Sequence, residues 1–177
     1  MDRNRVETRL CELPLAQYAW VRIEDITFSE RIRHVCETEC PMYGKSWACP
    51  PAVGSVEKCR ERCEAFSEAL VITTVTEVRD IADLEETLKT RAPHEEVTRQ
   101  VFRILREEAE TVMALSTEAC AVCETCTYPE GKPCRHPERM FPCVESYGIV
   151  ATDLAEKCGI EFFDGNLVTW FSILFYR

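Results

Sequence analysis

CETECPMYGKSWACPP, residues 36–51, is the stretch around which the rest of the chain is organised. It places three thiols, Cys36, Cys40 and Cys49, in a short segment that ends in two prolines. Clustered cysteines in a reducing compartment are metal ligands more often than disulfide partners, because thiols stay reduced there and a soft metal accepts several thiolates. We therefore expect this segment to form a metal-binding loop.

A second cysteine-rich stretch, CAVCETCTYPEGKPCRHP, spans residues 120–137. Cys120, Cys123 and Cys126 follow the C-x2-C-x2-C spacing of ferredoxin-type iron–sulfur sites, in which two intervening residues let successive thiolates curl around one cubane. Cys134 follows a turn that contains glycine and proline, and it offers a fourth thiolate. The spacing predicts a [4Fe–4S] cluster, with zinc bound by the same four cysteines as the alternative.

The first loop supplies only three cysteines, so its fourth ligand stays open. Cys59, Cys63 or Cys143 would complete the site, or no protein ligand does. Without a fourth thiolate, one iron is accessible to water or substrate and would act as a Lewis acid. Alternatively, Cys36 and Cys40 pair with Cys59 and Cys63 in a C-x3-C…C-x3-C zinc site.

Composition points to one domain, residues 1–177, in which 46% apolar residues bury a core without the help of cross-links. Nine of the twelve cysteines lie in residues 36–63 or 120–134, so they act in groups. The charged N-terminus lacks the apolar run of a secretory signal, which predicts a cytoplasmic location. The most apolar segment, residues 167–176, is too short for a membrane helix of ~20 residues, so we expect no membrane association.

The charge balance restricts the partners. Thirty-one acidic against 21 basic side chains give a formal net charge of −10. A nucleic-acid surface needs a basic stripe, so we expect no nucleic-acid binding. An acidic surface suits docking to a basic redox protein partner, although solubility alone would also explain it.

Apolar periodicity predicts an α+β fold, with a small mixed or antiparallel sheet packed with helices and the two cysteine-rich loops at one edge. Residues 69–75 and 167–176 are β-rich and apolar on both faces, so we expect them as central strands. Other segments carry the signals of helix caps and helical periodicity. The expected helices are residues 55–66, a short helix capped by Asp80, residues 94–117, and a helix capped by Thr152 that ends at Gly159.

The N-terminal part carries weaker signals. Residues 1–16 show no clear period, and we expect an arm or loop there. Residues 18–35 are expected to hold at most a short strand or turn that leads into the first loop. Cys11 and Cys158 lie apart from the cysteine groups, and we expect ordinary thiols at both positions.

Three motifs resemble those of a known family: YGKSWACPP (43–51), CAVCETCTYPEGKPCRHPE (120–138) and ESYGI (145–149). From about Ile26 onward the chain resembles the prokaryotic predicted metal-binding protein family, a domain of unknown function. The family typically has serine where this chain has Cys143, so Cys143 is a departure from its pattern. The resemblance implies that the metal-binding positions are Cys36, Cys40, Cys49, Cys120, Cys123, Cys126 and Cys134.

These observations favour an iron–sulfur protein with one or two [4Fe–4S] clusters that passes single electrons to a protein partner. Two alternatives remain: a structural or interaction module stabilised by zinc, and an enzyme with an open iron in the first loop. The sequence contains no recognisable nucleotide-binding loop or nucleophile–base motif. We therefore assign no catalytic residue, and enzyme activity is left open.

Overall fold

The computed structural model describes Met1–Arg177 and contains a four-stranded antiparallel sheet in the order β1-β2-β4-β3. The central pair, β2 (Glu68–Glu77) and β4 (Leu167–Tyr176), is hydrogen-bonded along its whole length. The edge strands are β1 (Gln17–Arg22) and β3 (Val112–Leu115). The predicted α+β class with a small sheet is confirmed, and so are both predicted central strands.

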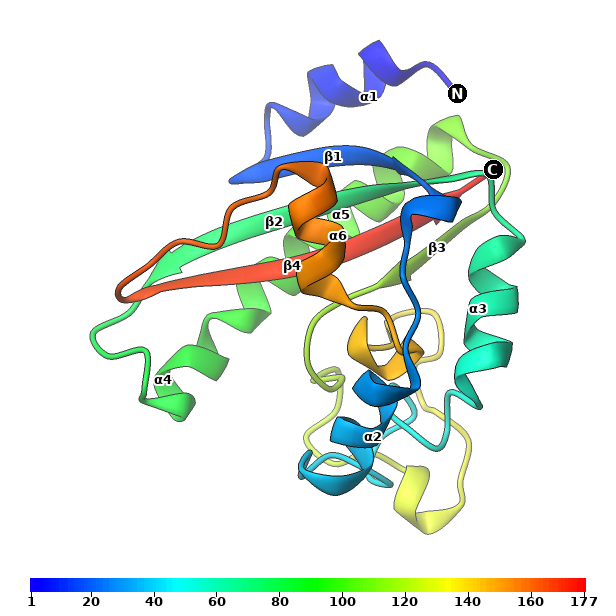
Figure 1. Cartoon of the computed structure of the whole chain (residues 1–177), viewed down its shortest axis with the longest axis vertical. Helices are drawn as coiled ribbons and strands as arrows, with labels where there is room; N and C mark the ends of the chain where they lie inside the picture. Colours follow the sequence, from blue (N-terminus) through cyan, green and yellow to red (C-terminus); the bar gives the residue numbers. More distant parts are fainter.

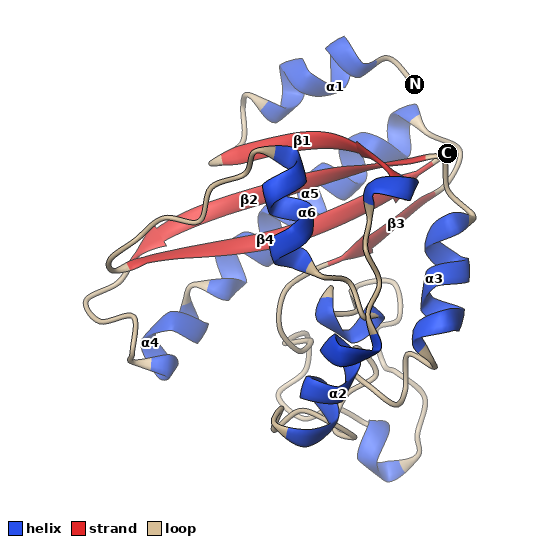
Figure 2. Ribbon diagram, viewed as in Figure 1, coloured by secondary structure: helices blue, strands red, loops and turns tan.

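Helices cover both faces of the sheet, with α6 in front of it and α5 behind it in Figure 1. The same layers are visible by element type in Figure 2. The α-helices are α1 (Arg3–Leu10), α2 (Glu30–Thr38), α3 (Val56–Glu64), α4 (Leu84–Lys89), α5 (Arg91–Glu108) and α6 (Ala151–Cys158). Short 3-10 turns lie at η1 (Ile23–Asp25), η2 (Tyr128–Glu130) and η3 (Glu145–Tyr147).

The alternation of side chains along the central strands builds two cores, because successive residues of a strand point to opposite faces. On β2, Ala69 and Val71 join one apolar cluster, whereas Leu70 and Ile72 join the other. The second cluster packs against α1 and α5. Burial of both faces explains why these strands read as continuous apolar runs.

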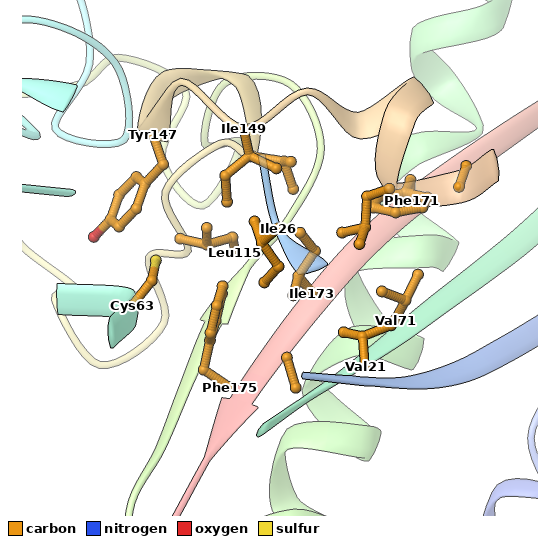
Figure 3. Close-up of a cluster of buried hydrophobic side chains, with 14 of the residues drawn as sticks. Val21, Ile26, Cys63, Val71, Leu115, Tyr147, Ile149, Phe171, Ile173 and Phe175 are labelled. Carbon is orange, nitrogen blue, oxygen red and sulfur yellow. The ribbon is translucent and has the colours of Figure 1, made fainter. Parts of the chain in front are cut away.

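The first cluster lies between the sheet, α3, α6 and η3. Figure 3 shows Cys63 pointing into it together with Leu115 and Phe175 from the sheet. Tyr147, the last residue of η3, and Ile149, two residues later, reach the same cluster. The segment after η3 is therefore anchored in the core, and it fixes the position of the cysteine loops beside it.

The expected N-terminal arm is wrong, because residues 3–10 form α1. Asp2 caps this helix by accepting a hydrogen bond from the backbone N–H of Arg5, at 3.2 Å. Val6 and Leu10, four residues apart, are buried on one face of the helix. That spacing was the available signal, and the mixed charges around it concealed it.

Residues 18–35 also hold more structure than expected, namely β1, η1 and α2. Ser29 caps α2 by accepting a hydrogen bond from the N–H of Arg31, at 3.2 Å. Cys36 therefore lies in the last turn of a helix, not in a loop as predicted.

The predicted helix over 94–117 ends at Glu108, and residues 112–115 form β3 instead. Pairing with β4 decides this, because Val112 to Leu115 lie opposite Tyr176 to Ile173 and gain ladder hydrogen bonds. The predicted helix after Ser55 is confirmed, and Ser55 caps it. The last helix ends before Gly159, as expected, where φ is 65°, but the predicted Thr152 cap is wrong, because Thr152 lies inside the helix. The short helix α4 is likewise capped by Asp83 and not by Asp80.

The two cysteine-rich loops lie together beside β3, at the lower end of the molecule in Figure 1. Ser116, just after β3, accepts a hydrogen bond from the N–H of Val144 and donates its own N–H to Pro142, both at 2.9 Å. The chain leaves the sheet at Ser116 to form the second loop and returns alongside it at residues 142–144. None of the helices has the length and apolar character needed to cross a membrane.

Candidate metal centre

The first loop begins at the end of α2. Cys36 lies in the last turn of this helix and Cys40 directly follows its C-cap, Glu39. The loop then folds back on itself, since the N–H of Gly44 donates to the carbonyl of Pro50 at 2.8 Å. Gly44 has a φ of 69°, a conformation that favours glycine. This closure brings Cys49, which is only 5% exposed, towards the end of α2.

The three thiols of the first loop act on one another electrostatically. The pKa of Cys49 is raised to about 12, mainly by burial and to a smaller extent by the nearby thiols of Cys40 and Cys36. The pKa of Cys36 is raised by burial and then by Cys40. Thiols in such surroundings stay protonated unless a cation replaces the protons, as metal binding does.

Cys143 lies beside the first loop. Its backbone N–H donates to the carbonyl of Ala48 at 3.2 Å, and its thiol lies 2.7 Å from Oε2 of Glu145. Burial is the main cause of the raised pKa of Cys143, and the negative charge of Glu145 adds to it.

Cys59 and Cys63 lie elsewhere, on the inner face of α3. Both are fully buried in the apolar cluster between α3 and the sheet, where Figure 3 shows Cys63. The polar neighbours of the Cys59 thiol are the carbonyl of Val53, at 3.5 Å, and the guanidinium groups of Arg33, at 3.8 Å, and Arg62, at 4.0 Å. The four-residue spacing of Cys59 and Cys63 is thus that of a core-facing helix stripe.

The four cysteines of the second loop line one small cavity of about 20 Å³. Burial raises the pKa of Cys120, the backbone N–H of Val122 opposes this, and Glu95, Cys134 and Cys123 raise it further. All four thiols are half-buried, so the cavity lies close to the surface. Its lining also includes Ser46, Trp47, Val122, Thr127, Arg135, His136 and Met140.

Hydrogen bonds to backbone carbonyls hold the second loop in shape. Arg91, at the start of α5, donates to the carbonyl of Ala119 at 2.6 Å, directly before the first cysteine. Arg135 donates to Thr125 at 2.9 Å, and the hydroxyl of Thr127 donates to Pro133, also at 2.9 Å. Both ends of the loop are therefore tied, although it contains little regular structure.

Two carboxyl groups lie next to the cysteine loops, the half-buried Glu95 and the exposed Glu118. Burial raises the pKa of Glu95, while Ser116 and Arg99 lower it. Partial desolvation also raises the pKa of Glu118, and Glu145 adds to this. Glu118 is the one residue other than glycine with a positive φ, 53°, an unfavourable conformation that often marks functional sites.

Arg33 is a residue that the sequence did not single out. It is 6% exposed, and it donates to the carbonyl of Gly54 at 2.6 Å and to the carbonyl of Ser146. Its positive charge lowers the pKa of Cys36, against the raising effect of burial. No salt bridge to a carboxylate compensates this buried cation, and nothing in the local sequence distinguishes it from its exposed neighbours.

The donor set fits a thiolate-bound metal in type and number, but the side chains do not form a closed coordination shell. No group of three or more Cys, His, Asp or Glu side chains is close enough to hold a metal ion. Metal binding therefore requires the thiols around the cavity to change position. Coupling of this kind is usual where metal binding and local ordering occur together.

Comparison with known proteins gives one match. A family model described as "Predicted metal-binding protein" matches residues 19–176, nearly the whole chain. No curated protein and no solved structure matches the chain.

Proposed function

The chain belongs to the predicted metal-binding protein family, and from this premise we propose that it is an iron–sulfur protein that transfers single electrons. The second loop holds one [4Fe–4S] cluster through Cys120, Cys123, Cys126 and Cys134. Cys36, Cys40 and Cys49 hold a second cluster. When bound, each cluster supplies a one-electron redox couple.

The observation that carries this proposal is the shared cavity of the second loop. Four thiols with ferredoxin-like spacing line it, and no other titratable side chain except Arg135 and His136 does. A cluster held by four thiolates carries net negative charge. Arg135, tied to the loop carbonyl of Thr125, would offset part of that charge and so raise the reduction potential.

The position of the loop supports electron transfer to a partner. The cysteines of the second loop are half-buried, and the loop projects from the sheet at the lower end of Figure 1. A cluster there would lie close to a docked protein. The net charge of −10 favours a basic redox partner, whose encounter would be steered by electrostatics. A cytoplasmic location, where thiols stay reduced, is part of this proposal.

Zinc is the competing metal, because the same four thiolates would also suit a tetrahedral zinc site. The protein would then be a structural or interaction module. Zinc and iron–sulfur differ in colour, acid-labile sulfide and redox activity, so the two functions are separable by direct measurement.

The test is a redox titration of anaerobically purified protein, followed by electron paramagnetic resonance (EPR). We expect a signal of a reduced cluster that appears on reduction and disappears on reoxidation. Cys123→Ala should lose the signal of one whole cluster. Cys11→Ser, which changes an exposed thiol, should leave the signal unchanged. A wild-type protein without any redox-active signal would contradict the proposal.

A further inference from the structure

We propose that Cys143 is the fourth thiolate of the first metal site, which therefore consists of Cys36, Cys40, Cys49 and Cys143 and is closed to substrate. This inference rests on the proposed function and specifies the ligands of the site in the first loop. It also distinguishes between the alternatives for the first loop, since a closed site has no open iron.

Backbone contacts place Cys143 next to the first loop. The N–H of Cys143 donates to the carbonyl of Ala48 at 3.2 Å, and Ala48 directly precedes Cys49. The opposite side of the same segment is tied to Ser116 at the end of β3. Cys143 is thus held between the sheet edge and the first loop, 107 residues after Cys36 in sequence.

Glu145 connects Cys143 to Cys36. The thiol of Cys143 donates to Oε2 of Glu145 at 2.7 Å, while Sγ of Cys36 lies 4.0 Å from the backbone carbonyl oxygen of the same residue. Cys49, Cys36 and Cys143 therefore surround the start of η3. Each of the three is also within electrostatic range of another cysteine of this group.

The other cysteines considered as fourth ligand lie in the wrong environment. Cys63 points into the apolar core beside Leu115 and Phe175 (Figure 3). Cys59 is buried in the same cluster, and its thiol is already used in a hydrogen bond to the carbonyl of Val53, at 3.5 Å. Moving either one to the first loop would extract a fully buried side chain and leave a destabilising cavity. Cys143, by contrast, already lies beside the first loop, because its N–H donates to the carbonyl of Ala48.

Arg33 supplies the positive charge that such a site requires. An ion or cluster bound by four thiolates carries net negative charge, and a buried negative charge needs compensation. The guanidinium of Arg33 is buried, lacks a carboxylate partner and lies within electrostatic range of Cys36. Its bond to the carbonyl of Ser146 joins it to the segment that carries Cys143.

A complete set of four thiolates changes the chemistry of the first site. With every iron bound by a cysteine, water and small substrates have no coordination position, so the site stores and passes electrons. An open iron would instead bind small oxyacids and act as a Lewis acid. The reaction of the reduced protein with citrate separates these two cases.

The experiment compares wild-type protein with Cys143→Ser, Cys59→Ser and Cys11→Ser, all purified without oxygen. Iron and acid-labile sulfide are counted per chain, and the EPR spectrum of the reduced protein is recorded with and without citrate. We expect the wild-type spectrum not to respond to citrate. Cys143→Ser should either lose about half of the iron or gain a citrate-dependent shift. Cys59→Ser and Cys11→Ser should match the wild type in both.

Two results would overturn the assignment: a wild-type spectrum that shifts with citrate, or a folded Cys143→Ser protein with wild-type iron and no citrate response. Circular dichroism checks the folding, and the citrate experiment on the wild type remains decisive if the variant does not fold. If the wild type contains zinc and no iron, the proposed function fails. The ligand assignment is then judged by whether Cys143→Ser binds less zinc than the wild type.

Discussion

The indole Nε1–H of Trp47 donates a hydrogen bond of 3.1 Å to the carbonyl oxygen of Lys132, and this bond joins the two cysteine-rich loops. Trp47 also packs edge-on against Tyr128, with 4.9 Å between the ring centroids. Because Trp47 lines the cavity of the second-loop cysteines, a residue of the first loop protects the site of the second.

Replacing Trp47 with Phe keeps an aromatic ring but removes this hydrogen bond, at a cost of about 1 kcal/mol. Release of the second-loop metal to a chelator should then be about fivefold faster. Trp20→Phe is the matched control, because the indole of Trp20 donates to Glu7 at 2.7 Å, on α1 and away from the loops. Equal release rates in the two variants would show that Trp47 does not couple the loops.

Gly148 is the position where an added methyl group should be most harmful. Its φ is 75°, and a Cβ there would lie 2.9 Å from Cγ1 of Val56 and 3.2 Å from the carbonyl oxygen of Ser29. Gly165 has a similar φ of 78°, but nothing lies within 4 Å of the same atom. Backbone strain alone should make Gly165→Ala cost about 1 kcal/mol, whereas Gly148→Ala should cost about 1–3 kcal/mol more. Urea unfolding measures both, and similar losses would refute the predicted clash.

Arg33 should contribute strongly to stability. Arg33→Met would leave the carbonyls of Gly54 and Ser146 without their donor, and we expect the free energy of unfolding to fall by about 3 kcal/mol. Arg60→Met is the control, because Arg60 is exposed and only pairs with Glu64 one helical turn away. That exposed pair should contribute less than about 0.5 kcal/mol. Equal losses of unfolding free energy in the two variants would show that the buried bonds of Arg33 do not stabilise the fold.

His94 should make stability depend on pH. Its ring is buried and bonded to Ser172 at 2.7 Å and to Thr74 at 2.9 Å, and burial lowers its pKa from 6.5 to about 3. Between these values the unfolded chain binds a proton that the folded protein does not. The free energy of unfolding should therefore fall with falling pH across this window, by up to about 1.4 kcal/mol per pH unit.

In His94→Gln this contribution is absent. The difference in unfolding free energy between wild type and variant should therefore shrink as the pH is lowered from 7 to 4. Chemical unfolding at several pH values provides the measurement, and parallel curves for the two proteins would contradict the assignment.

The two central strands and several helix ends were predictable because their signals are local. β2 and β4 are apolar on both faces, and Ser55 and Gly159 mark helix ends by their capping chemistry. β3 was not predictable in this way, since residues 112–115 continue an apolar helical pattern. Only their pairing with β4 turns them into a strand, and that contact is invisible in the local sequence.

The candidate site follows the same rule. The four cysteines of the second loop are close in sequence, and the structure places them around one cavity. The neighbours of the first loop come from distant segments: Cys143 by its contact with Ala48, and Arg33 by its burial beneath η3. Cys59 and Cys63 have the spacing of ligands, but the same spacing also places a helix stripe in the core.

The most direct test of the account is a count of iron, zinc and acid-labile sulfide per chain in protein prepared without oxygen. We predict brown protein in which iron and sulfide are present in equal amounts, as in a cubane cluster, and zinc is absent. Colourless protein that contains zinc and no sulfide would contradict the central claim that these cysteines hold iron–sulfur clusters.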